Sequence, residues 1–287
     1  MDVVALVEAL DVVSVALVVG AVALQSTLGM GLTFIRTDPV GAIKAMLAMF
    51  VAMPAFVLLV TWILPLDRPI ALALLALSVS PMPPTLPSKE KEMGGTSEYV
   101  AGTLILAPLV ALLAIPLFVA IAGGVFGRSV THDNAAVLNI LVLTLAAPLF
   151  IGLMINRRAP ELAAKLSRPV GLLGAILLVI AGVGVLVTAF PAILDALGNG
   201  TLLVIVAIAG FGLLAGHLAG GPHPGNRHAL ALICSQRHPG VAMAIAVSAF
   251  PSEAQATLGA VLIYVIASSL IAIPYGRWRS SAGKGHG

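Results

Sequence analysis

Charged residues are scarce in this sequence. Of its 287 residues, 9% are charged and 60% are hydrophobic, and the mean hydropathy is +1.10. A soluble globular domain carries about 25% charged residues, so this composition excludes a water-solvated surface over most of the chain. Apolar runs long enough to cross a hydrocarbon core of about 30 Å recur from end to end. We therefore expect one all-α membrane domain, residues 1–287, embedded in the lipid bilayer.

Cysteine is almost absent, and the motifs of common catalytic sites are missing. The single Cys234 excludes an intrachain disulfide, and the ligand spacing of a zinc site does not occur. The sequence has no Gly-rich phosphate loop, no His-x-x-x-His pair and no nucleophile elbow. We therefore expect no metal, no cofactor and no enzymatic activity, and a membrane enzyme is the least favoured class.

Nine apolar runs lie between charged or Gly/Pro-rich breaks, so we expect nine transmembrane helices. Their approximate ranges are 9–33, 42–64, 69–93, 96–124, 135–156, 167–190, 200–219, 227–250 and 254–275. The connections between them are short, which favours a compact helical bundle.

Basic residues gather on one side of this predicted topology. With the N-terminus outside and the C-terminus inside, the inside segments contain ten basic residues and two acidic ones, Asp38 and Glu161. The basic ones are Arg36, Lys44, Arg157, Arg158, Lys165, Arg168, Arg227, Arg277, Arg279 and Lys284. The outside acidic residues are Asp2, Glu8, Asp11, Asp67, Asp133, Asp195 and Glu253.

An excess of Lys and Arg is typical of cytoplasmic loops. The basic pI of about 9.3 therefore reflects membrane orientation, and we expect no nucleic-acid partner. The pattern predicts a multi-pass protein of the cell membrane, specifically a bacterial inner membrane.

Two of the nine spans contain helix breaks, because interior prolines remove backbone donors and clash with the preceding turn. In the span near 69–93 the breaking residues are Pro81, Pro83, Pro84 and Pro87. In the span near 227–250 a polar run, Ser235, Gln236, Arg237 and His238, leads into Pro239 and Gly240.

The two broken spans occupy matching places in the chain. If it divides near residue 130, into repeats of about 9–124 and 135–275, each broken span is the penultimate one of its half, and the two cross in opposite directions. Matching broken helices are typical of inverted-repeat transporters, with the substrate site where the breaks meet. The alternative is that the prolines merely kink ordinary packing helices.

Several short motifs resemble one transporter family. The segment 29–33 (Gly-Met-Gly-Leu-Thr) resembles the end of an early helix in that family, one of its panel domain. Met53-Pro54 resembles a motif in the helix that follows. Segments 81–95 and 235–242 align with two crossover segments. Together they resemble the bile acid:sodium symporter family over nearly the whole chain. The resemblance implies a panel domain and a core domain in which two discontinuous helices cross.

The oxygen ligands that this resemblance would imply for sodium are replaced here. The family's Ser-Asn pair after the first break corresponds to Leu86 and Pro87, and its two helix hydroxyls correspond to Val100 and Leu104. Its Gln before the Met-Pro corresponds to Met49, and its Glu and Gln at the second break correspond to Ile233 and Arg237. Aliphatic and thioether side chains do not coordinate a hard cation. We therefore predict that transport does not depend on sodium.

Ionisable residues accompany the breaks instead. Such groups inside membrane spans are costly and usually functional. Arg237 is a candidate for the electrostatic role of a bound sodium ion, and Glu90, Glu92 or His238 for proton binding. We expect Arg237 to contact Glu90 or Glu92. As alternatives, residues 89–92 form a solvated cytoplasmic loop, and His238 bonds a carbonyl freed beside Pro239.

We therefore expect a secondary active transporter that moves a small organic anion by alternating access. The expected substrate and ion pathway consists of Ser235, Gln236, Arg237, His238, Thr85, Lys89, Glu90, Lys91 and Glu92. Two alternatives stay open: a sodium-coupled symporter of the same fold, and a non-transporting membrane sensor or scaffold.

Overall fold

The fold is described by a computed structural model, in which every regular element of the described residues is helical. The described residues are 3–64, 66–82, 95–126, 134–188, 190–191, 194, 200–249 and 254–283. Seven of their helical segments are long and apolar enough to cross a membrane: Ala5–Leu24, Pro39–Ile63, Glu98–Ile121, Leu138–Arg158, Pro160–Thr188, Thr201–Ala219 and Ala256–Trp278. These coincide with seven of the nine predicted spans, and the architecture is that of an all-α membrane protein.

Shorter helices occupy the two remaining predicted spans, which are the two expected to be broken. α5 (Arg68–Val79) ends before the extended Ser80, and the part of that span from residue 83 to residue 93 lies outside the described residues. In the other span, α13 (Pro224–Ser235) and α14 (Pro239–Ala249) are separated by residues 236–238.

The predicted second break differs from the observed one in its position. Pro239 and Gly240 are the first two residues of α14, so they begin the new helix, and the break itself lies over residues 236–238. Proline is well tolerated as the first helical residue, because the N–H that it lacks would have no partner there.

The predicted first span, 9–33, consists of two helices. α1 (Val3–Leu24) ends just before three polar residues, and α2 (Leu28–Thr37) follows. The Ser26 hydroxyl donates to the Val22 carbonyl at 2.8 Å, which satisfies an acceptor at the end of α1. The apolar pattern continues through this change of helix, which is why the sequence alone did not show it.

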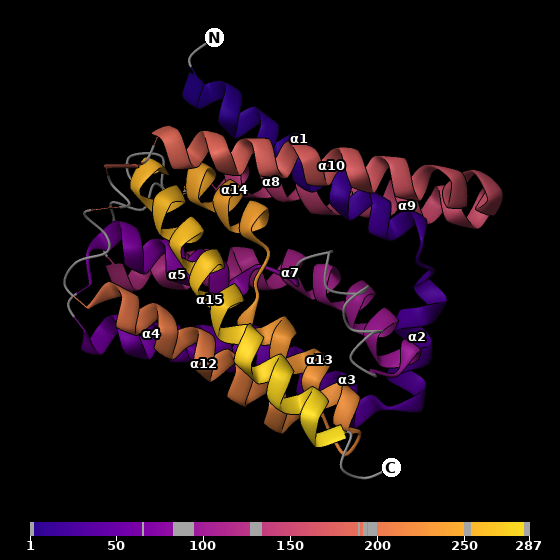
Figure 1. Cartoon of the computed structure of the whole chain (residues 1–287). Helices are drawn as coiled ribbons and strands as arrows, with labels where there is room; N and C mark the ends of the chain where they lie inside the picture. Colours follow the sequence, from indigo (N-terminus) through magenta and orange to yellow (C-terminus); the bar gives the residue numbers. More distant parts are fainter. Residues whose placement is uncertain are drawn as a thin grey trace.

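One group of helices surrounds α1. This helix packs against η2 (Val142–Ala146), α9 (Ala147–Arg158) and α10 (Pro160–Thr188), and Figure 1 shows α1 and α10 side by side. Small residues bring them close, because a side chain at Gly174 would meet the backbone of Val18.

The second group is formed by the helices on the other side of the molecule in Figure 1. Its members are α3 (Pro39–Leu47), η1 (Ala48–Ala52), α4 (Met53–Ile63), α5, α7 (Ser97–Phe126), α12 (Thr201–Ala219), α13 and α15 (Ala254–Gly283). Of the remaining helices, α2 packs against α7 and α3, and α8 (Asn134–Leu141) continues into η2. α14 joins the two groups, because it contacts both α1 and α5.

The two halves of the chain share an order of helix lengths. α5 and α13 each have 12 residues, and each begins with a proline in its first turn. Each is followed by a break and later by a helix of 30 residues, α7 in the first half and α15 in the second. This shared order gives the two breaks equivalent places in the fold.

Candidate functional site

The two helix breaks contact each other directly. The backbone N–H of His238, in the second break, donates a hydrogen bond of 2.9 Å to the carbonyl of Pro81, in the first. His238 is 1% exposed and Pro81 is buried. This hydrogen bond joins two segments that lie far apart in the sequence, at the points where each leaves helical geometry. The candidate site is built around this junction.

Arg237 caps the C-terminal end of α5. Its Nε donates to the Leu77 carbonyl at 3.1 Å, and its Nη2 donates to the Ser78 carbonyl. The last carbonyls of a helix have no partner within the helix, and the dipole makes that end negative. The guanidinium therefore supplies both hydrogen bonds and positive charge to a helix end that the first break leaves open.

The same guanidinium donates to a third carbonyl, that of Met49, at 2.9 Å. This oxygen is available because of the Met53-Pro54 pair. The Met53 N–H bonds to the Ala48 carbonyl in a π-helical turn, and Pro54 has no N–H to offer. The proline thus leaves the Met49 carbonyl free in the middle of an apolar span, and Arg237 satisfies it.

Arg237 has one terminal nitrogen left over. Its Nη1 has no hydrogen-bond partner among the described residues, although the side chain as a whole is 2% exposed. The ring of Phe50 lies 5.8 Å from the guanidinium carbon, within reach of a cation–π contact. A buried cation with a spare donor can bind an anionic group. The expected partners Glu90 and Glu92 lie outside the described residues.

A second side chain caps the other short helix. The hydroxyl of Tyr264, on α15, donates to the Ser235 carbonyl at 2.9 Å, at the end of α13. Tyr264 is 1% exposed and Ser235 is fully buried. Each break therefore leaves a helix end whose carbonyls are satisfied by a side chain from another element, and both ends are held in fixed positions.

His238 caps the start of α14 from the residue before it and leaves one donor without a described partner. Its Nδ1 accepts a hydrogen bond of 3.3 Å from the Val241 N–H, so a neutral imidazole carries its proton on Nε2. This Nε2 has no acceptor among the described residues. His238 thus both caps a helix start and offers a polar atom at the junction.

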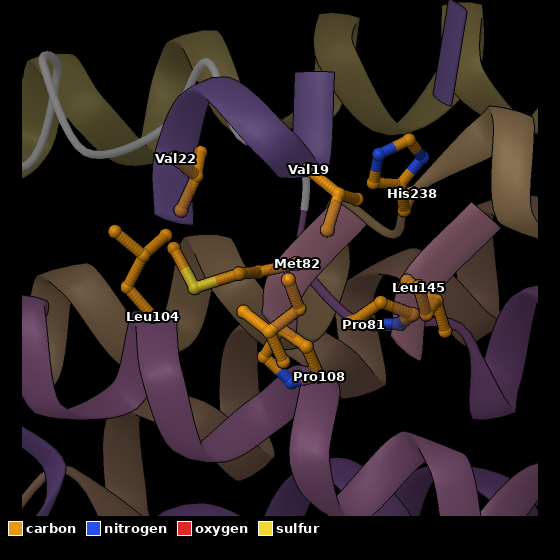
Figure 2. A pocket seen from close by; sticks show the side chains of 9 residues that line it. Val19, Val22, Pro81, Met82, Leu104, Pro108, Leu145 and His238 are labelled. Atoms are coloured by element: carbon orange, nitrogen blue, oxygen red, sulfur yellow. The ribbon is translucent and has the colours of Figure 1, made fainter. Parts of the chain in front are cut away.

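A small cavity lies beside the junction, and Figure 2 shows the side chains around it. Its lining comes from both helix groups and both breaks: Val19, Val22, Pro81, Met82, Leu104, Pro108, Leu145, Leu149 and His238. Its free volume of about 20 Å³ has room for about one water molecule. An organic solute would need the helix groups to separate here.

The expected pathway residues are only partly placed by this structure. Ser235, Arg237 and His238 meet Pro81 and the end of α5, and Gln236 is half-buried beside them, with its N–H bonded to the Leu232 carbonyl. The remaining expected residues, Thr85, Lys89, Glu90, Lys91 and Glu92, and the prolines Pro83, Pro84 and Pro87, lie outside the described residues.

Two functional candidates were not predicted from the sequence. Asp11, assigned there to the outside segment, is 4% exposed within α1. Tyr264 lies within the predicted span 254–275 and was not singled out. The signal for Asp11 was present, because it shares a helical stripe with the apolar Val15 and Val19. Tyr264 carried no signal, since its role depends on where α13 ends in space.

Comparisons with known proteins add no assignment. Neither the family models nor the curated proteins match the sequence. Within the described residues, His, Cys, Asp and Glu form no group of three that could hold a metal ion.

Proposed function

We propose that this protein is a secondary active transporter that moves a small organic anion by alternating access. The observation that carries this proposal is the contact between the two breaks, where the His238 N–H bonds the Pro81 carbonyl. Breaks at equivalent places in two halves, meeting inside the protein, are the arrangement in which transporters bind substrate. We include in the proposal nine spans in an inverted repeat, with the N-terminus outside, and a distant membership of the bile acid:sodium symporter family.

The division into two helix groups supports alternating access. The group around α1, α9 and α10 corresponds to a panel domain, and the group containing α5, α7, α12, α13 and α15 corresponds to a core domain. The small cavity is lined from both groups. Rocking of one group against the other would therefore enlarge the cavity and expose the junction to one side of the membrane at a time.

Positive potential at the junction supports an anionic substrate. Arg237 keeps Nη1 without a described partner, and α14 begins beside it with the positive end of its dipole. Hydrogen bonds from a guanidinium to carboxylate or phosphate oxygens are charge-assisted and strong, and Nη1 is the nitrogen that can donate them here. The solute is therefore an organic anion small enough to pass between the helix groups.

Transport in vesicles tests this proposal. We would screen small carboxylates, sulfonates and phosphates for stabilisation of the purified protein, then measure uptake of radiolabelled hits into proteoliposomes. Saturable uptake that is lost in Arg237→Ala and kept in Arg36→Ala is expected, because Arg36 is an exposed arginine at the end of α2. Binding of a ligand without uptake by the wild-type protein would favour a membrane sensor.

A further inference from the structure

A buried carboxyl group lies against the start of α14. Asp11, on α1, is 4% exposed, and its Oδ1 has no hydrogen-bond partner among the described residues. A methyl group placed on Gly240, the second residue of α14, would lie 3.2 Å from this oxygen. The carboxyl group therefore faces the start of α14, just after the second helix break.

The contact between α1 and α14 is closely packed around this carboxyl group. A side chain at Gly240 would collide with Val15, which is fully buried one turn along α1 from Asp11. His238, two residues before Gly240, is also buried and keeps Nε2 without a described partner. Asp11 and His238 thus each bring a polar atom that no described residue binds to the contact between α1 and the start of α14, which we call the α1–α14 seam.

The charged and titratable side chains on the other elements packed against α1 lie at the far end of that helix. They are Arg157 and Arg158 on α9, and Glu161, Lys165 and Arg168 on α10. Gly184 faces Val7 while Gly171 faces Ala21, so the charged start of α10 lies beyond Ala21, away from Asp11.

Closer groups do not supply a positive partner either. η2 and α14 contain no charged residue, and Arg237, beside His238, directs its described hydrogen bonds to α5 and η1. On α1 the neighbouring acid is Glu8, one turn earlier. Among the described residues, the titratable side chain nearest in sequence to Gly240, which Asp11 faces, is therefore that of His238.

We propose that Asp11 is the proton-binding residue of the transport cycle and that its proton holds α1 and α14 together. A carboxylate buried without a partner is costly, so the closed seam requires the neutral acid. When the helix groups separate, water reaches Asp11, the O–H bond breaks and the proton passes to water. The resulting carboxylate opposes closure until it takes up a proton again. This inference rests on the proposed transport function for its role in the cycle.

Infrared spectroscopy of the full-length protein tests proton binding without any transported solute. The wild-type protein at neutral pH should show the carbonyl-stretch band of a protonated carboxylic acid, shifted in deuterated buffer. The band should be lost in Asp11→Asn and kept in Glu98→Gln, because Glu98 is an exposed acid in the first turn of α7. If Asp11→Asn does not fold, Asp11→Glu should show the band at a shifted frequency.

A wild-type spectrum without this band would overturn the inference, and so would a band that persists unchanged in Asp11→Asn or Asp11→Glu. The result is independent of uptake. A band assigned to Asp11 in a protein that carries no solute would leave the proton site standing and remove the transport function. Saturable uptake without the band would support the transport function and remove the proton site.

Discussion

Arg237 donates to three carbonyl groups, of which that of Leu77 also accepts from Ser80, while those of Ser78 and Met49 depend on the guanidinium. It replaces, within one side chain, the hydrogen bonds that α5 loses at its end and that η1 loses before Pro54. A buried acceptor left unsatisfied costs about 1–3 kcal/mol. The residue is therefore as much a structural cap as a candidate binding group, and its variants have to separate the two roles.

Replacement of Arg237 by alanine should lower stability and abolish transport. We expect a loss of about 2 kcal/mol or more, because the carbonyls of Ser78 and Met49 lose their donor together, whereas that of Leu77 keeps Ser80. Arg237→Lys should recover part of both losses, since a point charge cannot reach three carbonyls with the geometry of a guanidinium. Thermal unfolding and vesicle uptake measure the two effects. Normal uptake by Arg237→Ala would remove Arg237 from the site.

Tyr264 offers a cleaner measurement of one helix cap. Tyr264→Phe removes the hydrogen bond to the Ser235 carbonyl and keeps the ring in place. We expect the free energy of unfolding to fall by about 1–3 kcal/mol, because the carbonyl becomes a buried acceptor without a donor. Tyr275→Phe, on the same helix but in a different contact, is a comparison that should leave the Ser235 break unchanged. An unchanged melting temperature in Tyr264→Phe would contradict the capping role.

At the scale of elements, α12 and α13 meet through a stripe of glycines. Side chains at Gly212 and Gly216 on α12, and at its C-cap Gly220, would each collide with the backbone of α13. This spacing of every fourth residue places all three on one face of α12. Such small-residue faces allow membrane helices to approach closely. Here they bring α13 against α12 as far as Ser235, the last residue before the second break.

Gly216→Ala should therefore disturb the candidate site from a distance. The added methyl group would meet the carbonyl of Leu230 and the Cα of Ala231, which are backbone atoms that cannot rotate away. We expect a stability loss of about 1–3 kcal/mol, as for overpacked interiors, and weaker uptake. Gly210→Ala is the matched control, because nothing lies within 4 Å of its added methyl group. Equal melting temperatures for the two variants would show that α12 and α13 can move apart without loss of stability.

The sequence predicted these elements better than it predicted their ends. Long apolar runs identified all seven long spans. A proline run and a Pro-Gly pair identified the two broken spans, because bilayer length and missing backbone donors act locally. The end of α1 at Leu24 and the start of α14 at Pro239 were misplaced. Those boundaries depend on side chains such as Ser26 and His238 satisfying helix ends, and a hydropathy pattern does not contain that information.

For the whole molecule, sodium independence tests whether the arginine has taken the place of an ion. The guanidinium already occupies the Met49, Leu77 and Ser78 carbonyls, and the side chains of Val100, Ile233 and Met49 offer no hard oxygen. We expect the wild-type melting temperature and uptake to be the same in sodium and choline at equal ionic strength. Arg237→Gln removes the built-in cation and frees the carbonyls, so any sodium-specific stabilisation should arise in this variant. Saturable stabilisation of the wild-type protein by sodium would show that the site keeps ion ligands and that Arg237 does not replace them.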